Sequence, residues 1–194
     1  MKKHYVFGKS YKIKDDFNYV YSYAAKTHTE FNTEENCVVN RYNAALAGEQ
    51  YPYDYISVIT KEKYGNVTAT TECSFESFGA PLIVFSDDIR EENGEKYYGV
   101  HFEVVAYENG LNVWYILPGE DKKSIQPTLI ASLEFPVEEN KPHTLRVSVK
   151  DKTIYAEMNG RTLQVSHNAI PETFYIGITA CEQVNRFYSF TIED

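Results

Sequence analysis

The stretch that decides the fold is HTLRVSVKDKTIYAEMNGRTLQV, residues 143–165. Apolar and polar residues alternate through it with the period of a half-buried β-strand. Turns at Asp151-Lys152 and at Asn159-Gly160 keep the apolar residues of three successive strands on one side of the sheet. We therefore predict an antiparallel three-stranded unit with one buried face, in which Arg146 and Glu157 form an ion pair on the other face.

A second hairpin is predicted around Asn109-Gly110, a dipeptide suited to the positive φ angles of a type I′ turn. A two-residue loop at this pair aligns apolar residues of both flanking strands on one face. The opposite face then carries polar and aromatic side chains. The predicted register sets Val105 across from Trp114 and Tyr107 across from Asn112.

Short strands separated by turn residues cover most of the remaining sequence. They are predicted at Tyr19–Ala25, Tyr55–Thr60, Val67–Phe75, Pro81–Phe85, Leu129–Phe135, Thr173–Cys181 and Arg186–Glu193. Helical periodicity is confined to a turn or two at Asn43–Ala47, and the charged segment Asp87–Lys96 reads as an exposed loop. More than ten strands without helices imply two packed antiparallel sheets, so we predict an all-β sandwich with one domain over residues 1–194.

The composition excludes some classes of partner. Hydrophobic residues make up 43% of the 194 residues and aromatic residues 15%, which favours a folded, soluble, β-rich domain. The formal net charge of −9 argues against nucleic acid or an anionic membrane surface as a partner, because both require clustered positive charge. No apolar run approaches the length of a membrane span.

The cysteines and the start of the chain bear on the compartment. Cys37, Cys73 and Cys181 are odd in number and widely spaced, so we predict free buried thiols rather than a disulfide framework. Residues 1–14 have a basic beginning but lack the unbroken apolar run of a secretory signal. A cytoplasmic location is predicted, and a processed extracellular domain is left open as the alternative.

The second half of the chain resembles a known superfamily. The segments Phe174–Cys181 and Asn185–Ile192, with the passage from His143 through Asn159-Gly160, are similar to the concanavalin A-like lectin/glucanase superfamily in its laminin-G-like branches. The resemblance extends over about residues 67–194. It implies a jelly-roll sandwich with a curved sheet that often binds sugars. The Glu-x-Asp-x-(x)-Glu run of family 16 glucanases is absent, and its nearest analogue is His101-Phe102-Glu103.

The candidate binding site is the polar and aromatic face of the predicted Asn109-Gly110 hairpin. It carries the only tryptophan of the chain, Trp114, together with Tyr107, His101, Glu103 and Asn112. An aromatic platform edged by hydrogen-bonding groups suits the apolar face and hydroxyl rim of a pyranose ring. We predict that this sheet is concave and that a glycan binds in an open groove on it. The groove is lined by Trp114, Tyr107, His101 and Glu103, and its walls are the segments Asp87–Lys96 and Gly119–Gln126.

Three alternatives remain open at this stage. The face could be covered, with Trp114 and Ile116 in a satellite core, or it could be buried in a homodimer of a structural module. The chain could also be a glycoside hydrolase or polysaccharide lyase that uses Glu103 or His101. Since glycosidases usually need two carboxylates, Glu72 or Glu157 would then be the partner of Glu103.

The sequence does not predict a metal or another cofactor. The five histidines show no metal-ligand spacing. Asp87-Asp88 and Glu91-Glu92 could supply oxygens to Ca²⁺, but no Asp-x-Asp-x-Asp-Gly loop accompanies them.

Overall fold

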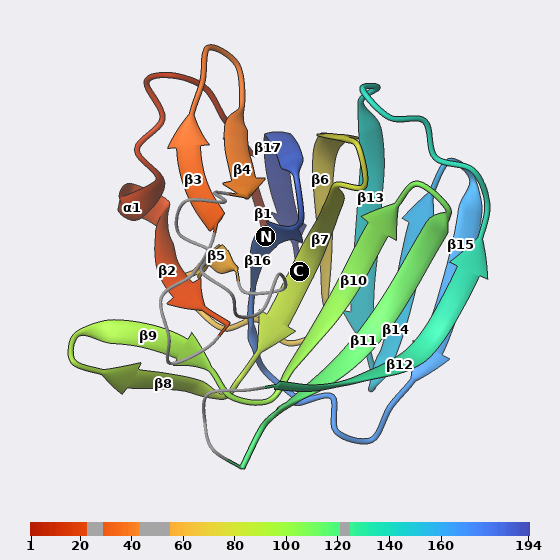
Figure 1. The fold of residues 1–194 in the computed structure, drawn as a ribbon. Helices are drawn as coiled ribbons and strands as arrows, with labels where there is room; N and C mark the ends of the chain where they lie inside the picture. Colours follow the sequence, from red (N-terminus) through yellow and green to blue (C-terminus); the bar gives the residue numbers. More distant parts are fainter. Residues whose placement is uncertain (23–28, 43–54, 121–124) are drawn as a thin grey trace.

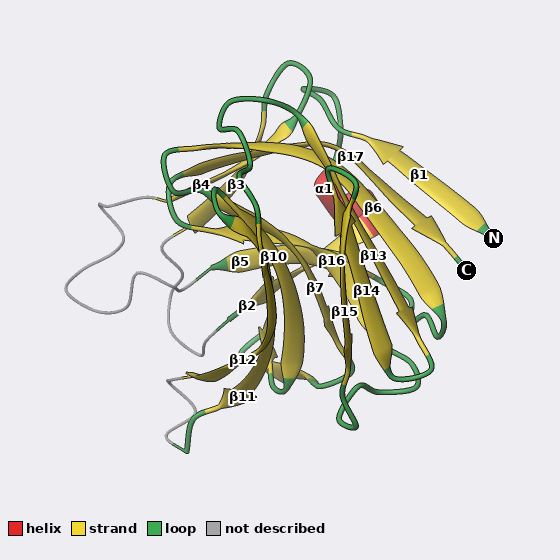
Figure 2. Ribbon diagram, turned by 90° about the vertical axis from the view of Figure 1, so that its right-hand side faces the viewer, coloured by secondary structure: helices red, strands yellow, loops and turns green. Residues whose placement is uncertain are grey.

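A computed structural model shows two β-sheets packed face to face (Figures 1 and 2). It describes residues 1–22, 29–42, 55–120 and 125–194. The elements are β1 (Lys2–Val6), α1 (Ile13–Asp16), β2 (Phe17–Tyr21), β3 (Thr29–Thr33), β4 (Val38–Tyr42), β5 (Ile56–Thr60), β6 (Val67–Glu76), β7 (Ala80–Ser86), β8 (Ile89–Glu92), β9 (Glu95–Tyr98), β10 (His101–Tyr107), β11 (Gly110–Pro118), β12 (Ile125–Glu134), β13 (His143–Lys150), β14 (Thr153–Met158), β15 (Arg161–Ser166), β16 (Tyr175–Cys181) and β17 (Val184–Glu193). The predicted two-sheet architecture is confirmed.

The two sheets differ in size. The eight-stranded sheet has the order β15-β14-β13-β6-β17-β4-β3, with β1 also paired to β17. The nine-stranded sheet has the order β12-β11-β10-β7-β16-β5-β2-β9-β8. The strand pairs are antiparallel except β2 with β9, which are parallel and joined through Tyr21 and Tyr97. The chain ends meet on β1 and β17, where the Met1 amino group lies 2.8 Å from the Asp194 carbonyl oxygen (Figure 2).

The main core lies between the sheets, and we call the sheet surfaces that line it the inner faces. Large aromatic side chains fill it, including Phe85, Phe102 and Phe187. The nine-stranded sheet also buries a second apolar cluster on its other surface, the outer face, with Leu82 and Val84 at its centre. Strand β7 is therefore buried along its whole length, as its continuous apolar run predicts.

The three-stranded unit of residues 143–165 is confirmed in its register. Val149 pairs with Ile154 across the first turn, and Ala156 pairs with Leu163 across the second. The turn residues Asp151 and Lys152 have φ angles of 48° and 59°, and Asn159 and Gly160 follow at 51° and 71°. These positive values are those of a type I′ turn, which suits the right-handed twist of the strands.

The β10–β11 hairpin turns one position earlier than the sequence predicts, which shifts the pairing of the two strands by two residues. Its loop is Glu108-Asn109, so Glu103 faces Trp114 and Val105 faces Asn112. Gly110 instead begins β11 at a φ of 132°, where an added Cβ would lie 2.0 Å from the Leu133 carbonyl oxygen of β12. The glycine is needed for this close approach of β12, and not for a type I′ turn. Because the shift is an even number of residues, every side chain stays on its predicted face.

The segment Asp87–Lys96 is not a loop, contrary to the prediction. It forms most of the β8–β9 hairpin, which turns at Asn93 and Gly94 with φ angles of 54° and 82°. Its charged residues conceal the strand pattern, while Ile89 packs on the outer-face cluster.

Other features of the chain complete the description. The predicted turn of helix at Asn43–Ala47 and the end of the predicted strand Tyr19–Ala25 lie outside the described residues. Cys37 and Cys73 are buried and Cys181 is half-buried, and all three are free thiols. No helix in the described parts of the chain is long and apolar enough to cross a membrane.

Candidate functional site

Three polar side chains meet beneath the outer surface of the nine-stranded sheet. Tyr55, which directly precedes β5, places its hydroxyl oxygen 3.1 Å from His101 Nε2 and in contact with Glu103 Oε1. The distance from His101 Nε2 to Glu103 Oε1 is 3.3 Å. The three side chains are only 1%, 1% and 4% exposed. They form a closed hydrogen-bonded group, which we call the buried triad.

Burial holds the buried triad in its neutral form. It raises the pKa of Glu103 to about 8 and lowers the pKa of His101 to about 4, because a charged group loses solvation when it leaves water. His101 Nδ1 lies 2.9 Å from the Gly99 carbonyl oxygen, which only accepts, so Nδ1 carries the proton and Nε2 is an acceptor. At neutral pH, the triad holds a protonated carboxyl and a neutral imidazole.

The β9–β10 connection positions the His101 ring. The Tyr98 ring stacks on it with centroids 4.7 Å apart. The Asp88 carboxylate accepts a 2.9 Å hydrogen bond from the Val100 amide, and Gly99 packs so closely that an added Cβ would lie 1.7 Å from an Asp88 oxygen. This packing fixes the Gly99 carbonyl, which in turn selects the histidine tautomer.

The predicted site residues share one face, but not one open groove. Trp114, Tyr107, His101 and Glu103 all lie on the outer face, and Trp114 is the direct cross-strand neighbour of Glu103. However, His101 and Glu103 are buried, so the prediction that they line an open groove is wrong. The concave shape of the sheet stays a prediction.

The accessible part of the predicted site is a strip along β11 and its neighbours. Three half-buried side chains form it: Trp114, Asn112 and Tyr107. The Trp114 and Tyr107 rings pack against the edge of the outer-face cluster. Leu129 of β12, the cross-strand partner of Trp114, is 46% exposed. We call Trp114, Asn112 and Tyr107 the aromatic strip. Ile116, by contrast, is fully buried, as the satellite-core alternative expects.

The two carboxylates that the sequence suggests as catalytic partners of Glu103 lie on the other sheet. Glu72 lies on β6 and Glu157 on β14, both exposed on the outer face of the eight-stranded sheet. The full thickness of the sandwich therefore separates them from Glu103. Burial alone raises the pKa of Glu103, with no contribution from a second carboxylate. A glycosidase pair of Glu103 with Glu72 or Glu157 is excluded.

Of the residues offered for Ca²⁺, Asp88 makes other contacts. Asp88 accepts hydrogen bonds from the Val100 amide and, at 3.3 Å, from Arg90. No group of three or more His, Cys, Asp or Glu side chains in the described ranges is placed to hold a metal ion.

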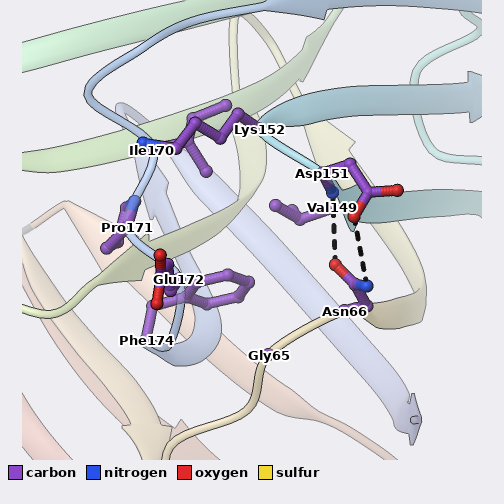
Figure 3. Close-up of a pocket in the computed structure, with 9 residues that line it drawn as sticks. All are labelled: Gly65, Asn66, Val149, Asp151, Lys152, Ile170, Pro171, Glu172 and Phe174. Atoms are coloured by element: carbon purple, nitrogen blue, oxygen red, sulfur yellow. Dashed lines mark hydrogen bonds between the residues drawn. The ribbon is translucent and has the colours of Figure 1, made fainter.

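A cleft opens at one end of the sandwich, beside the β13–β14 turn (Figure 3). It has a volume of ≈ 390 Å³, and its apolar wall is formed by Ile170, Pro171 and Phe174. Asn66 and Asp151 face each other there and form two hydrogen bonds, of 3.4 and 3.2 Å. Because these polar groups satisfy each other, the cleft offers few free groups to a ligand.

The two sheets, their strand order and the return of β17 to β1 define a concanavalin A-like jelly-roll sandwich. No family profile and no curated protein sequence matches the chain. The solved structures that share the fold include a protein of unknown function with a galectin-like fold from Bacillus subtilis, with a TM-score of 0.66 and 9% identity, covering 98% of this chain and 94% of that one.

Other matching structures include a carbohydrate-binding module and an alginate lyase. The carbohydrate-binding module CBM66 from Bacillus subtilis has a TM-score of 0.63 and 11% identity, over 86% of this chain and 92% of the module. A family 7 alginate lyase has a TM-score of 0.52 and 11% identity, over 87% of this chain and 84% of the lyase. At these identities the comparisons show the fold, which carbohydrate-binding modules and carbohydrate-active enzymes share.

Proposed function

We propose that this protein is a carbohydrate-binding β-sandwich whose ligand lies on the aromatic strip. The observation that carries the proposal is the placement of Trp114, Asn112 and Tyr107 on one accessible sheet surface. A half-exposed indole ring packs against the C–H face of a pyranose, and an amide can bind the hydroxyl groups at its rim. The fold supports this function, because it also occurs in a carbohydrate-binding module.

The dimensions of the aromatic strip favour an oligosaccharide over a single sugar. Tyr107 pairs with Gly110, and Trp114 lies four residues further along β11. At about 3.3 Å per residue, the two rings are separated by about 13 Å along the strands. Asn112 lies between them on the same face, so stacking and hydrogen-bonding groups alternate along the strip.

The test is Trp114→Ala in glycan-array screening followed by calorimetric titration of the best ligand. We expect binding to weaken at least about tenfold, since stacking on an aromatic anchor is commonly worth over 1 kcal/mol. Tyr155→Ala is the matched control, because Tyr155 is an exposed aromatic residue of the opposite sheet. Unchanged affinity in Trp114→Ala, with affinity lost in Tyr155→Ala, would place the ligand elsewhere.

The buried triad supports a second candidate, a carbohydrate-active hydrolase or lyase. A carboxyl with a pKa of about 8 can act as a general acid at neutral pH, and a neutral imidazole can accept a proton. A saccharide would have to reach side chains that are at most 4% exposed, which is why binding is the preferred function. The test is release of new chain ends from polysaccharides: activity lost in both Tyr55→Phe and Glu103→Gln would favour the enzyme.

The structural-module alternative is decided by oligomeric state. If the aromatic strip were the contact of a homodimer, light scattering would show a dimer that Trp114→Ala converts to a monomer. A monomer at all concentrations would leave the strip free for a ligand.

A further inference from the structure

A second cleft, of ≈ 420 Å³, lies on the outer face of the nine-stranded sheet, between β5, β16 and the β8–β9 hairpin. Its apolar lining consists of Ile59, which is fully buried, and of Ile89 and Tyr175, which are half-buried. The side chains of Lys61, Lys63 and Lys96 line the cleft as well. The combination of an aromatic ring and several ammonium groups is absent from the end cleft of Figure 3.

Each of the three lysine ammonium groups is hydrogen-bonded to uncharged oxygen atoms. Lys63 Nζ lies 3.4 Å from the Asp87 carbonyl oxygen and 5.2 Å from the centroid of the Tyr175 ring. Lys96 Nζ donates to Asn18 Oδ1 at 3.2 Å. Lys61 Nζ uses two of its three N–H donors, because it donates to two backbone carbonyl oxygens at 2.8 Å each.

Lys63 and Lys96 keep unused donors. Among the ion pairs of the described residues, none involves Lys63 or Lys96. An ammonium group has three N–H donors, and each of these two uses one for the neutral oxygens named above. Glu91 is the cross-strand neighbour of Lys96, yet Lys96 Nζ is bonded to Asn18.

The local charge opposes that of the whole protein. Three lysines and the carboxylates of Asp87 and Glu91 line the cleft, so its formal charge is 3 − 2 = +1. The chain as a whole has a net charge of −9. A positive cleft on an acidic protein attracts anions locally, although the protein repels them at long range.

We propose that this cleft binds the anionic group of an acidic saccharide, a carboxylate or a sulfate, with the sugar ring against Tyr175. Lys63 and Lys96 donate to the anionic oxygens, and Ile89 contributes apolar contact. A neutral sugar would supply no negative charge to the two lysines, and a free inorganic anion would not use the aromatic and apolar lining. This inference rests on the proposed function and names the class of its ligand.

The sheet order allows one oligosaccharide to contact the aromatic strip and the cleft together. Trp114 on β11 and Tyr175 on β16 both lie on the outer face, and β10 and β7 separate their strands. Three strand spacings of about 4.8 Å place them about 14 Å apart across the sheet. An acidic oligosaccharide is therefore the ligand that uses both sites.

The experiment compares three probes by calorimetric titration at low and at physiological salt. They are a short oligogalacturonate, its uncharged methyl ester and a sulfated galactan oligosaccharide. We expect the wild type to prefer at least one charged probe over the ester, with the preference reduced by salt. Lys63→Gln and Lys96→Gln should each weaken binding of the charged probe about two- to fivefold, and leave the ester unaffected. Lys150→Gln, an exposed lysine of the eight-stranded sheet, is the matched control.

The outcomes separate this inference from the proposed function. Binding of the ester and the charged probes with equal affinity, or charged-probe binding that survives the double variant Lys63→Gln/Lys96→Gln, would overturn the inference and leave the proposed function standing. Failure of all saccharides to bind would overturn both. Preference for carboxylate or for sulfate identifies the anionic group, and thermal unfolding of the lysine variants should match the wild type.

Discussion

The outer faces of the two sheets have opposite characters. On the eight-stranded sheet the face is wet and charged: Arg146 lies 3.7 Å from Glu157, and Arg186 lies 2.5 Å from Glu76. On the nine-stranded sheet the corresponding face buries Leu82, Val84 and a titratable triad. A sheet of a sandwich needs only one apolar face to pack against the other sheet, and the second apolar face of the nine-stranded sheet is covered by side chains of the same chain, including Tyr55 and Tyr98.

The test with the largest expected effect truncates one side chain on each outer face, a leucine on one and a threonine on the other. Leu82→Ala should lower the free energy of unfolding by about 2–5 kcal/mol, because Leu82 is fully buried in the outer-face cluster. Thr70→Ala, on the outer face of β6, should change it by no more than about 0.5 kcal/mol. Urea denaturation measures both, and similar losses would show that the two faces do not differ.

The next test uses the pH dependence of the buried triad. Between about pH 4.5 and 6.5, Glu103 and His101 together hold one proton in the native state and one proton in the unfolded state. The free energy of unfolding is therefore nearly independent of pH in this range, as far as these two residues are concerned. From pH 6.5 to 8 native Glu103 keeps its proton while the unfolded pair holds none, so stability falls as the pH rises. At about 1.36 kcal/mol per pH unit, and with the titrating group half-protonated at each end of the range, the wild type should lose about 1.3 kcal/mol.

Glu103→Gln should abolish that loss, because the amide does not titrate. The measurement is urea denaturation at pH 6.5 and at pH 8 for the wild type and the variant. Glu157→Gln removes an exposed carboxylate of the other sheet and should retain the wild-type dependence. Equal pH dependence in all three proteins would mean that Glu103 is ionised in the native state.

The smallest expected effect is on the charged face. Arg146→Ala breaks a cross-strand ion pair whose two side chains are about half exposed, so it should lower the free energy of unfolding by at most about 0.5 kcal/mol. High salt should reduce the difference further. A loss comparable to that of Leu82→Ala would mean that this face contributes more to stability than its exposure suggests.

Local alternation was sufficient to predict most of the fold. The turns at Asp151-Lys152 and Asn159-Gly160 could be predicted because the apolar alternation on both sides of each turn fixes the register without reference to the rest of the molecule. The β10–β11 turn could not, because its position depends on the close approach of β12 to Gly110, a contact made by a third strand. Hairpin β8–β9 was missed since its outward residues are charged at nearly every position.

The candidate site was predictable only in part. The period-2 alternation placed Trp114 and Glu103 on the same face of the sheet. This placement is correct even though the predicted pairing of the two strands is shifted by two residues. Nothing in the sequence brings Tyr55 to Glu103 across 48 positions, because strand order decides which segments cross the outer face.

The meeting of the two chain ends has a consequence for how this domain can be attached to something else. Residues Lys2 to Val6 pair with the last strand, so both ends leave the molecule from the eight-stranded sheet, at the same corner (Figure 2). A tether fused to either end, or a host chain into which the whole domain is inserted, would be anchored at this corner. The outer face of the nine-stranded sheet would then be directed away from the anchor, and a surface-immobilised form would present it to the surrounding solution.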